Sequence, residues 1–432
     1  MGGNAFKTLV PDAIFPRMPP AVYEALKASL YPVLRPLYAQ VVVPREAPGK
    51  EDYGDLDFVV CGPREGVTPA EVKAALRATH SIPMEGPRTS NFAISLNAWE
   101  EVARASQTWA AQGLGVAAGG GRVYLQVDVN VCPDPAHLER KLFESSYGDL
   151  GLILGLLVQT AGLSLSLYGL KLAEPVGSPP RTFYLSDNVS DILSFLGLSM
   201  ERWQRGFATQ DELLHWVASS PFAIAFAEYM KSKGGVPADK PRTEGRPLRQ
   251  KFIAFLQEHT FPPGSEGHSV FARLGHKEEK LVATLKYFGK ENEYAALINV
   301  ARAATRAKAV LNGRNVQEWT GVMGMPVRFI MDEMKERLAR RPAAAASGEG
   351  LEMVGDVPPW QRALLDMSDE EVRRLMVEVK EELDAAGKLE FDWRAAKAAK
   401  LEQKKQKELT ASSMPGQVSA AEAVSETQDG QS

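Results

Sequence analysis

One segment of the N-terminal half alternates strictly between polar and apolar side chains, and this alternation constrains the fold more than any other feature. In residues 124–131 the polar side chains Gln126, Asp128 and Asn130 alternate with leucine and valine. A period of two is that of a β-strand, so one strand face is polar and the other apolar. A carboxylate between two valines needs a partner that offsets its lost hydration. The segment therefore predicts a packed strand that presents Asp128 to a polar site.

A second acidic pattern stands earlier in the chain, where Gly54-Asp55-Leu56-Asp57 leads into the apolar run 58–60. Side chains two residues apart in a strand share a face, so Asp55 and Asp57 would project together. Neighbouring carboxylates repel one another unless a cation lies between them, and Mg²⁺ binds carboxylate and phosphate oxygens. If the two strands are neighbours, Asp55, Asp57 and Asp128 form a site for two Mg²⁺ or Mn²⁺ ions. The alternative is a turn in which the aspartates cap backbone amides.

Together these motifs resemble the three-aspartate signature of the DNA polymerase β-type nucleotidyltransferase superfamily. The resemblance implies a mixed sheet with helices and the transfer of a nucleoside monophosphate from an NTP to a hydroxyl group. It also implies that Asp55, Asp57 and Asp128 are the catalytic metal ligands. The opening residues 2–6 resemble the start of uncharacterised nucleotidyltransferase-like proteins of phages and fungi.

The loop before Asp55 departs from the superfamily pattern. Members usually carry a Gly-Ser pair upstream of the first aspartate, which holds the triphosphate, whereas residues 43–50 contain none. The remaining candidates for nucleotide binding combine backbone amides with one cation, and they are Gly2, Gly3, Asn4, Lys50 and Gly54. Arg45 is a further cation of this loop. Alternatively these residues form a solvated loop, and the chain keeps the fold as an inactive RNA-binding protein.

Helix and strand signals alternate up to about residue 175, and helical signals dominate from about residue 185, which predicts an α+β fold followed by an all-helical domain. We expect a nucleotidyltransferase-like catalytic domain in 1–180 and a helical RNA-binding or substrate-binding domain in 181–340. A linker with a charged helical extension (341–409) and a disordered tail (410–432) would follow. The expected helices are 21–38, 68–79, 150–161, 213–229, 248–258, 278–288, 294–311, 327–338 and 360–409, and the expected strands are 41–43, 57–60, 124–131 and 163–167.

The helical half contains a local excess of positive charge. Residues 231–314 hold 16 Lys or Arg and 8 Asp or Glu, although the whole chain has a net charge of -4. Arg302, Arg306 and Lys308 repeat at helical spacing and predict a face that binds RNA phosphates, with Arg314 beyond it. Residues 310–327 also resemble the helix-loop-helix element of CCA-adding enzymes and bacterial poly(A) polymerases. The alternative is a solvated helix surface.

Other features limit where the chain can act. Residues 150–170 carry no charge and are long enough to span a membrane, but the period changes after Gly162, which predicts a helix followed by a strand. The first six residues lack the pattern of a signal peptide, and two cysteines give no disulfide framework. We therefore expect a cytoplasmic or nuclear protein that is not secreted and does not enter a membrane.

These observations together predict an enzyme that uses Mg²⁺ or Mn²⁺ and an NTP, with a tRNA-like RNA 3′ end as the acceptor. Two alternatives stay open. One is an inactive nucleotidyltransferase fold that binds RNA, and the other is a transferase that modifies a protein or a small molecule.

Overall fold

The computed structural model describes residues 5–111, 122–233, 246–261, 277–341, 357–390 and 402. The chain divides into two compact units, residues 1–298 and 299–432, which we describe separately. The predicted tail in 410–432 lies outside the described residues, as do residues 342–356, 391–401 and 403–409 of the predicted linker and extension.

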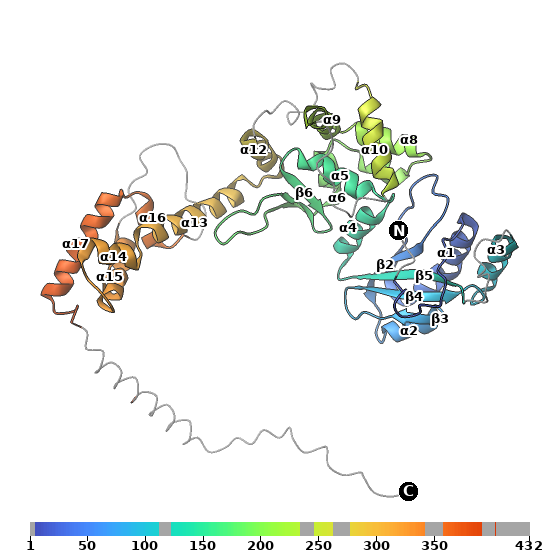
Figure 1. Cartoon of the computed structure of the whole chain (residues 1–432), viewed down its shortest axis with the longest axis horizontal. Coiled ribbons are helices and arrows are strands. Elements are labelled where there is room, and N and C mark those ends of the chain that lie inside the picture. Colours follow the sequence, from blue (N-terminus) through green and yellow to red (C-terminus); the bar gives the residue numbers. More distant parts are fainter. Residues whose placement is uncertain are drawn as a thin grey trace, which may run out of the picture. The chain divides into compact units, whose positions relative to one another are not determined.

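The first unit begins with a mixed five-stranded sheet, which confirms the predicted α+β class (Figure 1). The strand order is β1-β2-β5-β4-β3, and β2 and β5 are parallel whereas the other neighbours are antiparallel. The five strands are β1 (Tyr38–Val42), β2 (Asp55–Pro63), β3 (Ala78–Ile82), β4 (Thr89–Ser95) and β5 (Tyr124–Cys132).

Helices α1 (Pro20–Leu34), α2 (Pro69–Ala75) and α3 (Glu100–Ala111) supply the core that covers one face of this sheet. Leu26 of α1, Phe58 of β2 and Val127 of β5 are fully buried in that core. Because side chains alternate along a strand, Asp57 and Asp128 point to the opposite face. The apolar half of each alternating segment therefore forms the core, and the polar half forms a separate surface.

Helix α4 (Pro135–Ser145) crosses part of that opposite face. Asp134 caps its first turn, since its carboxylate accepts the amide of His137 at 2.7 Å. Leu138 of α4 packs on Cys61 and Cys132, which are register partners near the carboxyl ends of β2 and β5. Asp55 and Asp57 lie in the first three residues of β2, and Asp128 lies in the middle of β5.

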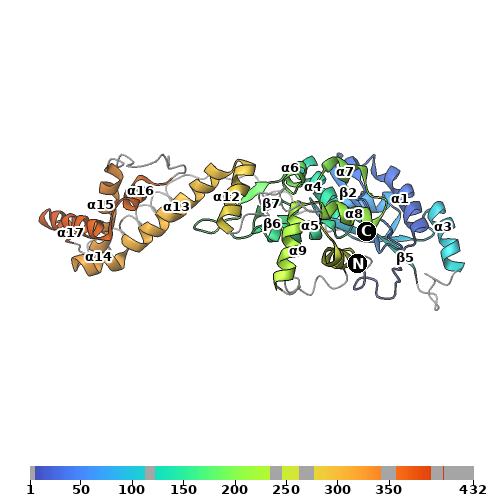
Figure 2. The ribbon, with the colours of Figure 1, turned by 90° about the horizontal axis from the view of Figure 1, so that it is seen from above.

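A second core begins at Phe143 and extends to Leu285. It combines α5 (Leu150–Gln159) with a three-stranded antiparallel sheet and several helices (Figure 2). Residues 143–180 therefore pack with the helical region and not with the five-stranded sheet. The further elements are β6 (Leu163–Ser166), β7 (Gly169–Leu172), β8 (Tyr184–Ser186), α6 (Val189–Phe195), α7 (Met200–Arg205), α8 (Gln210–Ala218), α9 (Pro221–Lys233), α10 (Pro247–Glu258) and α12 (Lys277–Phe288).

The uncharged stretch 150–170 folds as the change of period predicts. It forms the buried helix α5 and then strand β6, with Gly162 between them at φ +72°. In the part of the chain that the structure describes, no helix is long and apolar enough to cross a membrane.

The second unit is helical and has its own core. The boundary between the units falls inside α13 (Glu291–Val310), which is followed by α14 (Gly313–Thr320), α15 (Pro326–Arg340), α16 (Pro359–Leu365) and α17 (Asp369–Ala385). Asn312 caps α14, Gly321 ends it in the left-handed region at φ +72°, and Pro326 is in the first turn of α15. Glycine adopts the left-handed region without steric cost, and proline fits the first helical turn because no amide is needed there.

Several predicted boundaries are wrong. The helix expected at 68–79 ends at Ala75, because Arg77 adopts φ +53° and the chain continues as β3. The helix expected at 213–229 is two helices, since Pro221 starts α9 and cannot continue the hydrogen-bond ladder of α8. The helix expected at 21–38 ends at Leu34, and Tyr38 already belongs to β1. Strand β4 and helix α3 were not predicted from the sequence at all.

Candidate functional site

Two of the three predicted aspartates are direct neighbours across the parallel strands. Asp57 of β2 and Asp128 of β5 are register partners, and Asp55 is paired in register with Gln126. Because Asp55 and Asp57 are two residues apart in one strand, they share the face on which Asp128 lies. The structure therefore brings Asp55, Asp57 and Asp128 together on one face of the sheet.

Amide side chains on β4 and β5 hold Asp128 in place. Asn91 Nδ2 donates to Asp128 Oδ1 at 2.7 Å, and Gln126 Nε2 donates to the same oxygen at 3.0 Å. Within the described residues Oδ2 of Asp128 accepts no hydrogen bond, so this oxygen is available to a ligand. Asn91 was not predicted as a site residue. The only signal in the sequence is a polar residue directly before the apolar run Phe92-Ala93-Ile94.

Loss of surrounding water and nearby carboxylates raise the pKa of all three aspartates. Loss of surrounding water and then the charges of Asp55 and Asp128 raise the pKa of Asp57 to about 7, although its side chain stays accessible to solvent. Desolvation also raises the pKa of Asp128 to about 6, although the hydrogen bond from Asn91 lowers this pKa. The pKa of Asp55 is raised, mainly by desolvation. The site therefore holds negative charge that the protein compensates only in part.

A fourth carboxylate, Glu46, lies close enough to this site to raise the pKa of Asp55 and Asp57. Its side chain accepts the Tyr23 hydroxyl at 3.0 Å and forms an ion pair with Lys50 at 2.5 Å. Lys50, which was predicted to bind nucleotide, is thus paired to Glu46, and its charge lowers the pKa of Asp55. Tyr53, just before β2, stacks on Tyr23 with ring centroids 4.0 Å apart. Sequence reasoning missed Glu46, although it stands in the loop before Asp55.

The described part of the N-terminal segment runs along the same face of the sheet. The amide of Ala5 donates to Gln126 Oε1 at 3.1 Å, and Gln126 in turn donates to Asp128. Phe6 is fully buried and stacks on Phe15 with centroids 5.2 Å apart. Gly2, Gly3 and Asn4 lie outside the described residues, so their predicted role is untested. Gly54 is buried directly before β2.

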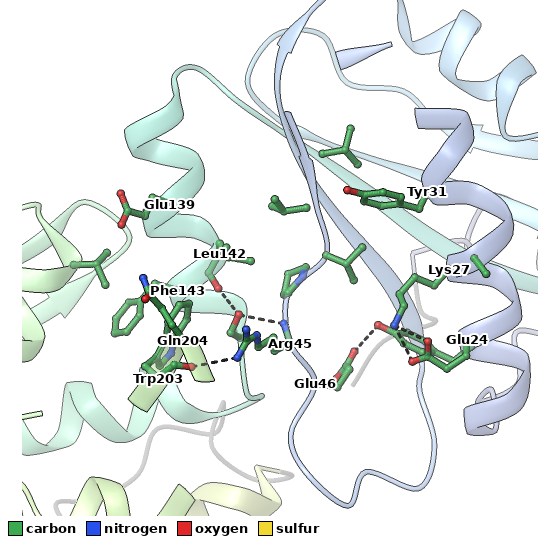
Figure 3. A pocket seen from close by; sticks show the side chains of 18 of the residues that line it. Glu24, Lys27, Tyr31, Arg45, Glu46, Glu139, Leu142, Phe143, Trp203 and Gln204 are labelled. Carbon is green, nitrogen blue, oxygen red and sulfur yellow. Dashed lines mark hydrogen bonds and ion pairs between the residues drawn. The ribbon is translucent and has the colours of Figure 1, made fainter. Parts of the chain in front are cut away.

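A pocket of about 1040 Å³ lies beside the loop that carries Glu46 (Figure 3). Helix α1 and strand β1 form one wall, and α4 and α7 form the other. Figure 3 shows Glu46 turned toward α1 and Arg45 turned toward Trp203. Arg45 Nη1 donates to the Tyr147 hydroxyl at 2.8 Å and to the Trp203 carbonyl at 3.3 Å. Arg45 therefore ties this loop to the helical region.

The donor atoms at the aspartates suit a hard divalent cation. Carboxylate oxygens on two neighbouring strands are typical ligands of Mg²⁺, which commonly takes one or two carboxylates and completes its shell with water and substrate phosphates. Among the described residues there is no group of three or more His, Cys, Asp or Glu that could hold a metal ion alone. Asp57 and Asp128 therefore fit a metal that is shared with a phosphate ligand, and do not form a complete protein cage.

The predicted RNA-binding residues do not form one face. Residues two apart on an α-helix point roughly 200° apart, so Lys308 lies nearly opposite Arg306 on α13. Arg306 bonds within the second unit, because its guanidinium donates to the carbonyls of Leu364 and Met367 and pairs with Asp369 at 2.5 Å. The prediction of a single basic face is wrong at these two positions.

Three of the four predicted cations remain on the surface, and Lys308 is one of them. Arg302 is exposed on α13, and Arg314 is exposed in the first turn of α14. Both belong to the second unit, and nothing in their surroundings assigns them a ligand.

No protein-family model matches this chain, and no curated protein matches it either.

Proposed function

We propose that the chain is a metal-dependent nucleotidyltransferase of the DNA polymerase β type, which transfers a nucleoside monophosphate from an NTP to a hydroxyl group. The observation that carries this proposal is the pairing of Asp57 with Asp128 on two parallel strands, with Asp55 on the same face. The charges of Asp55 and Asp128 contribute to raising the pKa of Asp57 to about 7, and a divalent cation would relieve that repulsion.

Each carboxylate has a distinct role in this proposal. Asp55 and Asp57 bind divalent ions together with the phosphates of the NTP. Asn91 and Gln126 hold one oxygen of Asp128, and its second oxygen completes a metal site and orients the attacking hydroxyl. When bound, Mg²⁺ neutralises charge on the phosphates and favours ionisation of the hydroxyl. Asp128 must be deprotonated to bind the metal, and its pKa of about 6 without metal means that this condition is lost at acid pH.

For the acceptor we propose an RNA 3′ end with a tRNA-like shape. The excess of Lys and Arg in residues 231–314 supports a polyanionic acceptor, because basic surfaces bind phosphate backbones without reading bases. The Gly-containing turn before Pro326, which leads into α15, supports it through the resemblance to CCA-adding enzymes.

A small-molecule acceptor is the second candidate, and the pocket beside Glu46 favours it. Glu24, Glu46 and Glu139 line this pocket together with apolar side chains and only two cations, Lys27 and Arg45. Lys27 is already paired with Glu24 at 2.6 Å. A phosphate backbone would be repelled by such a surface, whereas a neutral or cationic molecule with an apolar body would fit it.

The experiment that tests the function supplies each labelled NTP in turn. Purified full-length protein is incubated with the NTP, MgCl₂ and either total RNA or a small-molecule extract, and the label is followed by size. We expect transfer that stops when EDTA is added and in the Asp57→Asn variant. Label in the RNA fraction supports the first acceptor, and label in the small-molecule fraction supports the second. No transfer to either fraction, with tight NTP or RNA binding, would favour the inactive fold.

A further inference from the structure

A second pocket, of about 350 Å³, lies on the side of α4 away from the pocket that contains Glu46. It is lined by residues of α4, the start of α5, the turn between β6 and β7, and α6. Three cationic side chains line it, namely Arg140 and Lys141 of α4 and Arg246 just before α10. Glu144 is the only carboxylate among its lining residues. Lys141 pairs with Glu144 at 3.0 Å, so the positive charge that would attract an anion comes from the two arginines.

Both arginines have donors that the protein leaves unused. Arg140 Nη1 pairs with Asp187 at 2.9 Å, and Arg246 Nη1 pairs with Asp149 at 3.2 Å. The Nε atoms of both guanidinium groups are buried and have no hydrogen-bond partner among the described residues. These enclosed Nε atoms are not accessible from the pocket. No hydrogen bond among the described residues uses Nη2 of either arginine, however, and these two donors suit a ligand with several acceptor oxygens.

Small residues keep the pocket open between these cations. Gly148, Gly151 and Gly169 line it with Ser145 and Ser166, so no long side chain fills the space. A Cβ atom at Gly169 would lie only 2.3 Å from the carbonyl oxygen of Ser186, and that glycine has φ +110°. The backbone around the pocket therefore requires glycine at this position, and an approaching anion meets little steric obstruction.

The pocket is close to the aspartates. The ammonium of Lys141 lowers the pKa of Asp57, which places it near that carboxylate. At Gly148, a Cβ atom would lie 3.4 Å from the Cβ of Ala47, in the loop that carries Glu46 and Lys50. The pocket therefore borders the loop that leads to the aspartates, and the charge of Lys141 acts on Asp57.

We propose that this pocket binds a phosphate chain and holds the triphosphate of the NTP in place of the missing Gly-Ser pair. Binding of a phosphate chain follows from the pocket alone, whereas its assignment to an NTP rests on the proposed function. Arg140 and Arg246 donate to phosphate oxygens from Nη2, and Lys141 adds positive charge that acts on Asp57. Guanidinium groups are suited to this role because their fork of donors matches phosphate geometry.

Calorimetric titration of the full-length protein with inorganic tripolyphosphate, without metal, tests phosphate binding directly. We expect Arg140→Gln and Arg246→Gln each to weaken binding about tenfold, the scale of one charge-assisted hydrogen bond. The matched control is Arg205→Gln, since Arg205 is exposed and pairs only with Glu201 among the described residues. This control should bind as tightly as the unchanged protein.

The Arg140→Lys variant guards against a folding defect, because it keeps the positive charge and the chain length while removing the fork of donors. Weakened binding in this variant, with an unchanged thermal midpoint, supports the proposal. Absence of tripolyphosphate binding in the unchanged protein, or equal binding in all variants, would overturn it.

Two further measurements distinguish a failure of this inference from a failure of the proposed function. Asp57→Asn should leave metal-free tripolyphosphate binding intact even if transfer is lost. ATP and a 5′-phosphorylated oligonucleotide are titrated in parallel. Arginine-dependent binding of ATP alone supports the NTP assignment, whereas arginine-dependent binding of the oligonucleotide alone overturns it and leaves a site for an RNA phosphate.

Discussion

Asp57 and Asp128 are register partners on the parallel strands β2 and β5, so their carboxylates leave the same face of the sheet at the same level. Parallel neighbours come from distant parts of the chain, and here the helices and strands between residues 63 and 124 bring them together.

The three carboxylates should be essential for nucleotide transfer and dispensable for folding. We expect Asp55→Ala, Asp57→Ala and Asp128→Ala each to abolish Mg²⁺-dependent transfer, because charge compensation at the phosphates supplies most of the catalysis. The metal-free thermal midpoint should hold or rise, since each change relieves repulsion. Asp332→Ala, at a half-exposed surface position of α15, is the control. Full turnover by the Asp57→Ala protein would remove Asp57 from the mechanism.

Metal-free stability should fall as the pH rises from about 4 to about 7. The folded-state pKa values of Asp57 (about 7) and Asp128 (about 6) lie above the ordinary aspartate value, so the native state binds more protons than the unfolded chain in this window. Urea denaturation at several pH values without metal measures the slope. The double variant Asp57→Asn and Asp128→Asn should show a flatter profile, and added Mg²⁺ should stabilise the unchanged protein more at pH 8 than at pH 5. An equal slope in both proteins would contradict the raised pKa values.

Asn91 should influence the pH at which kcat/KM falls on the acid side. Its amide donates to Asp128 Oδ1 and lowers the pKa of that carboxyl, so Asn91→Ala should raise that pKa. The acid limb of kcat/KM would then move to higher pH, by up to about one unit. Asn130→Ala is the matched control. Asn130 lies on β5, the strand of Asp128, but its amide donates to the Thr89 hydroxyl and not to Asp128. A shift in the control of the same size would mean that the effect is general to the strand.

RNA binding should depend steeply on salt, and the exposed cations of the second unit should account for part of that dependence. Arg302→Ala combined with Arg314→Ala should reduce the log–log salt slope by roughly two, one for each lost phosphate contact. The measurement is binding of labelled RNA at a series of KCl concentrations. If the slope does not change, both arginines belong to a solvated surface.

Arg306 should contribute to stability and not to RNA binding. Arg306→Ala leaves the buried residues Leu364 and Met367 without donors to their carbonyls, so the free energy of unfolding of the second unit should fall by about 1–3 kcal/mol. Arg302→Ala, four residues earlier, should change it by less than about 0.5 kcal/mol because that side chain is exposed. Chemical denaturation followed by circular dichroism distinguishes the two. Equal losses would contradict the structural role of Arg306.

Local patterns in the sequence were sufficient to predict the strands that carry the aspartates. The alternation in 124–131 and the apolar run after Asp57 are both confirmed as strands, because a two-residue period with one apolar face has few other solutions. Strand β4 was missed, and with it Asn91, because a single polar residue before a short apolar run gives no periodic signal.

Contacts between distant segments could not be predicted in the same way. Glu46 stands in an irregular loop, and only the folded chain shows that it pairs with Lys50 and influences Asp57. Helical spacing predicted that Arg306 would be a surface cation, but packing of α16 and α17 against α13 provides acceptors for its guanidinium. Periodicity describes which side of a helix a residue occupies and does not say what will cover that side.

By itself the sequence determined that this chain contains two carboxylate-bearing strands, a separate helical region and a local basic excess, since these depend on residue order and composition alone. Only the tertiary structure decided that Asp57 pairs with Asp128, that Asn91 and Gln126 hold the latter, and that Arg140, Lys141 and Arg246 surround one pocket. The reason is physical: hydrophobic burial selects strands and helices locally, whereas the partners of buried polar groups are set by which distant segments the same burial brings into contact.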